Sequence, residues 1–283
     1  MTAGLIDFSK RGDDEQPSPS VWAGCPRTLL SDHGYGLYVH RDFAAEVTLP
    51  GLLDAGTGTQ TWAYNDANGD TVVRAGTGSE DNDSVLAFTR PLGRVIRNSH
   101  SNTKLWFETR VALVQINDQA AFFGLVEGDG VAGGDDLIAD DPSNSAQAGL
   151  EDVSLIGFVT QQADSESTKL DAVYRNDDGD VVTVAADVTN SSALAQKTAN
   201  GQVQPDLRGD LAANEFRKLG VVYNSNLSRI EWFVDGVRVA TADVDESVDQ
   251  DEAYAGVVAL HNGTAAARSL DIDFFRAAAQ HRT

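Results

Sequence analysis

From residue 35 onward the chain is a series of short strand-like runs separated by turn residues, and this pattern limits the fold more than any other feature. The longest run, residues 104–114, is apolar at every second position apart from Thr109 (Leu105, Phe107, Val111 and Leu113). Successive side chains of a strand point to opposite faces, so this set should face a core. The body has no long helical period, and we expect only short helical turns at Leu211–Glu215 and Arg276–Gln280.

Three two-residue turns join neighbouring strand-like runs: Asn68-Gly69, Asp178-Gly179 and Asp235-Gly236. Such pairs accept the positive φ angles that tight hairpin turns require. They predict antiparallel hairpins at about 61–74, 170–187 and 229–241. Many antiparallel strands with few helices predict an all-β, two-sheet antiparallel sandwich.

The sequence divides into three parts. Residues 1–34 have no helix or strand period and carry prolines among serines, so we expect an extended N-terminal arm. Residues 35–276 form the predicted sandwich, and 277–283 a C-terminal tail. The arm should dock through Trp22, Cys25 and Pro26, either on its own sandwich or on a neighbouring subunit.

The order of motifs resembles the concanavalin A-like (laminin-G-like) jelly roll. The motifs are KLWFETRVAL (104–113), AFFGLVE (121–127), FRKLGVVY (216–223), RIEWFVDGVRVAT (229–241) and LDIDFFR (270–276). Together with DAVYR (171–175) and the residues Asp273–Ala278, they look like virion proteins of tailed bacteriophages and archaeal tailed viruses. The resemblance covers about residues 100–280.

That resemblance implies a capsid decoration protein, made in the host cytoplasm and placed on the exterior of the virion. Its implied partners are the major capsid protein and copies of itself, most simply as a trimer. It would act by adhesion, through buried surface area. A glycan-binding, lectin-like module is the alternative function, and a glycoside hydrolase of the jelly-roll type is a third.

The charge excludes some partners. The chain has 43 acidic and 21 basic residues, a formal net charge of −22, so nucleic acid and anionic membranes would repel it. Such acidity also fits a halophilic source. Cys25 is the only cysteine, which excludes an internal disulfide and a cysteine-based zinc site.

Catalytic patterns are absent from the sequence. Retaining glycosidases need two carboxylates about 5–5.5 Å apart, yet no Glu-x-Asp-x-x-Glu or Glu-x-Asp-x-Glu string occurs. Asp271 and Asp273 share one strand face without a third acid. No Gly-x-Ser-x-Gly motif accompanies the five histidines. The sequence therefore predicts no enzyme and no catalytic residues.

Calcium and glycans are the two kinds of ligand that the sequence leaves possible, and no organic cofactor is expected. Calcium prefers carboxylate oxygens, and the acidic loop offers Asp129, Asp135, Asp136, Asp140 and Asp141. A second acidic cluster, Asp66–Asp70, coincides with a hairpin turn. Glycans would stack on exposed aromatic rings, for which the candidates are Trp62, Trp106 and Trp232.

Overall fold

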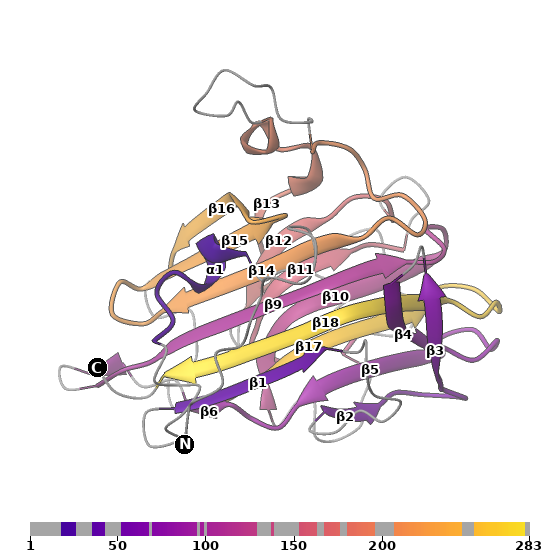
Figure 1. Cartoon of the computed structure of the whole chain (residues 1–283), viewed down its shortest axis with the longest axis horizontal. Coiled ribbons are helices and arrows are strands. Elements are labelled where there is room, and N and C mark those ends of the chain that lie inside the picture. Colours follow the sequence, from indigo (N-terminus) through magenta and orange to yellow (C-terminus); the bar gives the residue numbers. More distant parts are fainter. Residues whose placement is uncertain are drawn as a thin grey trace.

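A computed structural model gives the fold of the 283-residue chain. It describes residues 18–26, 36–42, 52–67, 70–94, 97–98, 101–128, 137–138, 153–162, 167–175, 180–195, 207–244 and 252–280. Within these residues nearly all regular structure is β-strand, as predicted (Figure 1). No described helix is long and apolar enough to cross a membrane.

Two antiparallel sheets form the body. The strands of sheet A follow the order β16-β15-β14-β9-β18-β4-β3, and β1 pairs with the far end of β18. Its strands are β1 (Gly36–Asp42), β3 (Thr61–Ala67), β4 (Asp70–Gly76), β9 (Lys104–Leu113), β14 (Arg217–Asn224), β15 (Arg229–Val234), β16 (Val237–Asp243) and β18 (Ser269–Gln280).

Sheet B has the order β13-β12-β11-β10-β17-β5-β2, and β6 pairs with β17. Its strands are β2 (Leu52–Ala55), β5 (Ser84–Thr89), β6 (Gly93–Arg94), β10 (Gln119–Glu127), β11 (Leu155–Thr160), β12 (Asp171–Arg175), β13 (Val182–Ala185) and β17 (Ala253–Asn262). A small separate pair joins β7 (Arg97–Asn98) to β8 (Ser101–Asn102), and two 3-10 turns cover Val188–Asn190 and Ser192–Leu194.

The main core lies between the two sheets. Leu105, Phe107, Val111 and Leu113 of β9 belong to it, which confirms the predicted parity of that strand. Trp232 of β15 crosses the core, and its Nε1–H donates to the carbonyl of Gly157 in β11 at 2.8 Å. A second apolar cluster includes Phe122, and Leu137 and Ile138 belong to it.

The three predicted hairpins are confirmed by strand pairing. Ala67 faces Asp70 between β3 and β4, Tyr174 faces Val182 between β12 and β13, and Val234 faces Val237 between β15 and β16. Asp235 and Gly236 have φ angles of 50° and 77°, the positive values expected of this turn.

The predictions at the edges of the body were less accurate. The helical turn predicted at Arg276–Gln280 is wrong, because β18 continues through these residues in pairing with β9 and β1. The tail predicted from residue 277 therefore begins inside a strand. Residues 211–215 contain a turn and no helix. The arm, expected to be extended, contains a short helix, α1 (Pro19–Trp22).

Candidate functional site

The outer face of sheet A, on the side away from sheet B, carries two parallel rows of residues that run across its strands. In register with one another, Gly220 of β14, Glu108 of β9 and Arg276 of β18 lie across this face. Two residues along each strand, a parallel row runs from β15 to β1 and consists of Glu231, Val222, Trp106, Ala278 and Tyr38. Both rows have the parity that points away from the core, and the alternate residues of the same strands fill it.

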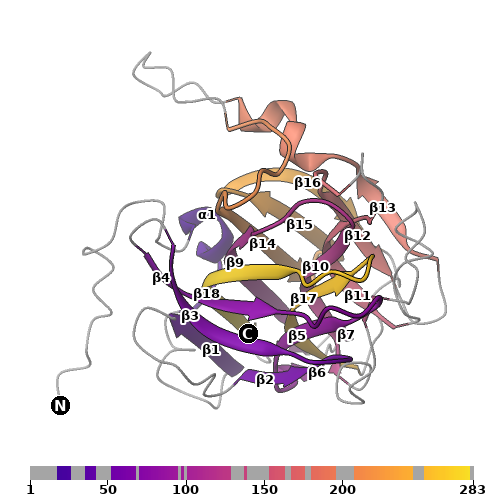
Figure 2. The same ribbon diagram turned by 90° about the vertical axis from the view of Figure 1, so that its right-hand side faces the viewer.

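Residues 18–26, which we call the N-terminal segment, lie on this face. Figure 2 shows α1 outside sheet A, on the side opposite sheet B. The backbone N–H of Ser18 donates to both carboxylate oxygens of Glu108, at 2.9 and 3.2 Å. The indole Nε1–H of Trp22 donates to Oε2 of Glu108 at 2.6 Å. Glu108, with 0% exposure, is therefore the polar anchor of the segment.

Apolar contacts support the anchor. Val21 is buried against Gly220, where a Cβ atom would lie only 2.7 Å from Cγ2 of Val21. The ring of Trp22 packs edge-on against Tyr38, with ring centres 5.9 Å apart. Trp22, Cys25 and Tyr38 cover Trp106 in a small cluster of their own. The segment thus covers part of two neighbouring rows of the sheet.

Burial beneath the N-terminal segment changes the pKa values of Glu108 and Cys25. Desolvation raises the pKa of Glu108, although hydrogen bonds from Ser18 and Trp22 and the charge of Arg276 act against it. Desolvation also raises the pKa of Cys25 from 9.0 to about 11. Neither group has the low pKa that an exposed carboxylate or a reactive thiolate would have.

Two further carboxylates on sheet A are neutralised by arginines. Asp271 accepts from Nε and Nη2 of Arg74, both at 2.7 Å, and from Nδ2 of Asn65 at 3.2 Å. Asp273, at a bulge in β18, accepts from Nη1 of Arg110 at 3.0 Å. Both aspartates are almost fully buried. Their pairing with arginines is typical of carboxylates that hold a sheet together.

A groove opens beside the N-terminal segment. It is a cavity of about 200 Å³ between the segment, the start of β9 and the β14–β15 hairpin. Its polar lining consists of Ser20, Lys104, Asn224, Arg229 and Glu231, and its apolar lining includes Val21, Trp106, Val222 and Leu227. The side chain of Leu227 is 59% exposed, so it offers apolar surface to a ligand at the edge of the groove.

Neighbouring residues hold the charged groups of the groove in place. Nε of Arg229 donates to Oδ1 of Asp243 at 2.8 Å, and Nη1 of Arg238 donates to Oε1 of Glu231 at 2.5 Å. A guanidinium has five N–H donors and a carboxylate about four acceptor positions. Arg229 and Glu231 therefore keep capacity for a ligand after these pairs are made.

Two of the three predicted glycan-stacking residues do not present ring faces to solvent. Trp106 and Trp232 are 1% and 0% exposed, so neither can serve as a stacking platform in this conformation. Trp62 is half-buried and packs against the main core. The predicted interface residues Trp22 and Cys25 pack against the chain's own sheet A, and Pro26 follows them half-buried.

The predicted calcium ligands Asp129, Asp135, Asp136, Asp140 and Asp141 lie outside the described residues, as does part of the 66–70 cluster. Within the described part of the chain, no three His, Cys, Asp or Glu side chains gather as a metal site would require. Of the histidines, His261 is fully buried in β17.

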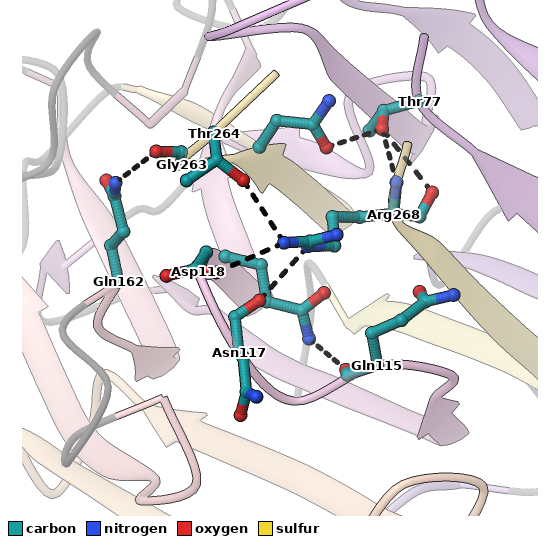
Figure 3. Close-up of polar contacts among 10 residues, drawn as sticks. Thr77, Gln115, Asn117, Asp118, Gln162, Gly263, Thr264 and Arg268 are labelled. Atoms are coloured by element: carbon teal, nitrogen blue, oxygen red, sulfur yellow. Dashed lines mark hydrogen bonds and ion pairs between the residues drawn. The ribbon is translucent and has the colours of Figure 1, made fainter. Parts of the chain in front are cut away.

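A second polar cluster, at one end of the sandwich, has a structural role. Arg268 reaches from the β17–β18 connection to the carbonyl of Asn117 at 3.0 Å and to Oδ2 of Asp118 at 3.4 Å (Figure 3). Its backbone N–H donates to the hydroxyl of Thr77, also at 3.0 Å. These contacts join the β4–β5, β9–β10 and β17–β18 connections. They also occupy N–H donors of Arg268 that a ligand would need.

Sequence reasoning missed the groove. Its polar residues come from β9, β14, β15 and the N-terminal segment, which lie far apart in the sequence. The one available signal was strand parity, since Lys104 and Glu108 occupy the non-core positions of β9. Nothing in the sequence indicated that the segment would cover Glu108.

No model of a protein family matches the sequence, and no curated protein does. Solved structures do match its fold. A protein of unknown function from Shewanella oneidensis MR-1 is 12% identical with a TM-score of 0.52, over 99% of this chain and 97% of that one. Peanut lectin, solved with a nine-residue peptide, is 12% identical with a TM-score of 0.51, over 87% and 99%.

A β-glucanase of Bacillus licheniformis is also similar, at 12% identity and a TM-score of 0.48, over 89% of this chain and all of that one. Another glucanase and a carbohydrate esterase of a bacteriophage are among the similar structures. These hydrolases contradict the prediction that the chain is not an enzyme, because the same fold serves both hydrolases and lectins. We therefore withdraw that prediction.

The comparisons contain nothing that points to a capsid decoration protein. At these identities they establish the fold and no more. The chain is a concanavalin A-like jelly-roll sandwich, the fold that it shares with peanut lectin.

Proposed function

We propose that the chain binds carbohydrate in the groove beside the N-terminal segment. The observation that carries this proposal is the lining of the groove, which combines donors and acceptors with an apolar wall. Lys104 and Arg229 can donate, Glu231 can accept, and Asn224 can do both. A sugar presents hydroxyl groups of both kinds around an apolar ring face, so this set of side chains suits it.

The arrangement of the groove also favours binding. Ligand sites generally combine an apolar surface with a few oriented polar groups. Here Asp243 orients Arg229, and Arg238 orients Glu231. The likeness in fold to peanut lectin supports the same class of ligand. The two carboxylates of β18, Asp271 and Asp273, are held by arginines, so the geometry supports binding better than any particular hydrolytic step.

A glycan array on the full chain tests the proposal, followed by Glu231→Gln and Asn224→Ala. Hydrogen bonds to charged groups contribute about 1.5–3 kcal/mol, so we expect Glu231→Gln to weaken binding roughly 10- to 100-fold. Glu80→Gln, an exposed acid in the β4–β5 connection, is the matched control and should leave binding unchanged. An array without hits would contradict the proposal. So would sugar affinities that are the same in the natural chain and in the two groove variants.

Attachment to a virus particle, predicted from the resemblance to virion proteins, stays a prediction. Carbohydrate binding is compatible with it, because a module on a virion exterior could bind host glycans. Co-sedimentation of the chain with particles and major capsid protein would test attachment separately from sugar binding.

A further inference from the structure

We propose that the N-terminal segment (residues 18–26) determines specificity by closing one side of the groove, so that the site accepts the end of a glycan chain and not its interior. This inference rests on the proposed carbohydrate binding. It concerns which part of a glycan the groove can hold.

The segment forms a wall of the groove and covers the sheet beyond that wall. Ser20, Val21, Ala23 and Gly24 line the cavity directly. On the far side of these residues, Ser18 and Trp22 are hydrogen-bonded to Glu108. Covered by the segment, Glu108 and Trp106 have almost no exposed surface. A glycan that enters over the β14–β15 hairpin can therefore contact Lys104 and Trp106 at the start of β9, but it meets the segment before it reaches β18 and β1.

Without the segment, the same face would be continuous. The row from Glu231 through Val222, Trp106 and Ala278 to Tyr38 crosses five neighbouring strands. At about 4.8 Å between strands, the row spans roughly 19 Å. Such a path, with two aromatic residues and flanking charged groups, has room for several sugar units. The segment reduces it to a cavity of about 200 Å³, below the usual 300–1,000 Å³ of drug-sized sites.

The wall is built into the sheet. Gly220 leaves the space that Val21 fills, since a Cβ at residue 220 would lie 2.7 Å from Val21. The hydroxyl of Ser20 donates to the carbonyl of Gly236 in the β15–β16 turn. Polar and apolar contacts thus fix the segment on three strands and one turn of the body.

Calorimetric titration of the full chain and of Trp22→Ala with short and long sugars tests the inference. The probes are the disaccharides and hexasaccharides of β-1,4-glucose, β-1,3-glucose and β-1,4-mannose, extended to the same pair of lengths for any linkage found on the array. For the linkage that binds, we expect the full chain to bind both lengths within about threefold, because further units would project into solvent. In Trp22→Ala the hexasaccharide should bind at least tenfold more tightly than the disaccharide.

Release of the segment is measured independently by the reaction of Cys25 with Ellman's reagent, which should become faster in Trp22→Ala. Gly220→Val serves as a second variant if Trp22→Ala leaves that reaction unchanged, and Glu80→Gln serves as the control. A full chain that strongly prefers the hexasaccharide would overturn the inference and leave carbohydrate binding intact. So would an unchanged length preference after the segment is released. Failure of every sugar to bind either protein would instead overturn the proposed function, and the inference with it.

Discussion

At the scale of single residues, Glu108 has the largest effect on the outer face of sheet A. A fully buried carboxyl is expensive unless hydrogen bonds compensate for the lost water. Here the compensation comes from the backbone of Ser18 and the indole of Trp22, both in the N-terminal segment. The position of the segment and the burial of this one acid therefore depend on each other.

The raised pKa of Glu108 predicts a pH-dependent stability. A carboxyl whose pKa is higher in the folded chain binds its proton more tightly there, so its contribution to the free energy of unfolding is complete below the unfolded value, near 4.5. That contribution is lost as the pH rises towards the folded pKa. We therefore expect the stability of the natural chain, relative to Glu108→Gln, to fall as the pH increases from 4.5.

Urea unfolding of both proteins between pH 4.5 and pH 8 measures this difference. Glu80→Gln, which alters an exposed acid, should show no such pH-dependent difference. If the natural chain instead gains stability over Glu108→Gln with rising pH, then the hydrogen bonds from Ser18 and Trp22 outweigh desolvation and the pKa of Glu108 is lowered.

Cys25 reports on the same contacts through its reactivity. With a pKa of about 11 in place of 9.0, its thiolate fraction at pH 8 is about 100-fold lower than that of an ordinary thiol. We expect Ellman's reagent to react with the folded chain about 100-fold more slowly than with the chain in denaturant. The single cysteine makes the signal unambiguous. Equal rates in the folded and unfolded chain would mean that the segment does not cover Cys25 in solution.

At the scale of elements, the alternation of apolar residues and the residue types at turns predicted the structural features that depend on neighbouring residues. The parity of β9 follows from its own sequence, and so does the pairing of the strands in the three hairpins. The helical turn predicted at 276–280 failed for a non-local reason. Its alanines pair with β9 and β1, and the packing of β18 between two strands outweighs the helical propensity of alanine.

The groove shows more strongly that local sequence patterns do not predict contacts between distant segments. Trp106 and Trp232 were candidates for sugar stacking because strand alternation puts each on the face opposite an apolar neighbour, Phe107 or Phe233. Trp106 is instead covered by the N-terminal segment, and Trp232 faces inward to reach sheet B. Which aromatic residues remain exposed depends on contacts between distant segments, and alternation within one strand contains no information about those contacts.

The hydrogen bond from Trp232 to Gly157 joins the two sheets, and its removal should lower the free energy of unfolding. Trp232→Phe leaves the Gly157 carbonyl without its donor and opens space in the core, so we expect a loss of about 2–4 kcal/mol in the free energy of unfolding. Trp62→Phe is a matched control. The Nε1 of Trp62 is buried without a hydrogen-bond partner in the described part of the chain, so its removal should cost under about 1 kcal/mol.

Chemical denaturation of the natural chain and the two variants compares these losses directly. The loss for Trp232→Phe should exceed that for Trp62→Phe by at least about 1 kcal/mol. Equal losses would mean that the hydrogen bond between the sheets contributes little and that both residues act through packing alone.

At the scale of the whole molecule, the net charge of −22 acts against the compact state. Folding brings 43 acidic side chains closer together, and only 21 basic ones are present to compensate them. Salt bridges of Arg74–Asp271 and Arg110–Asp273 neutralise two of the buried acids. Other described acids, including Glu80, Asp180 and Asp210, are exposed, and dissolved ions screen such surface charge over about 10 Å at 0.1 M salt and about 3 Å at 1 M.

Screening should stabilise the chain, so we expect the midpoint of thermal unfolding at pH 7 to rise steadily between 0.02 and 1 M sodium chloride. The same series at about pH 4.5 is the internal control, because many carboxylates are protonated there and the repulsion is already reduced. The salt effect should shrink accordingly. A midpoint at pH 7 that does not change with salt would mean that the paired acids and the spacing of the remaining ones leave little repulsion for salt to relieve, and that the acidity of this surface does not limit its stability.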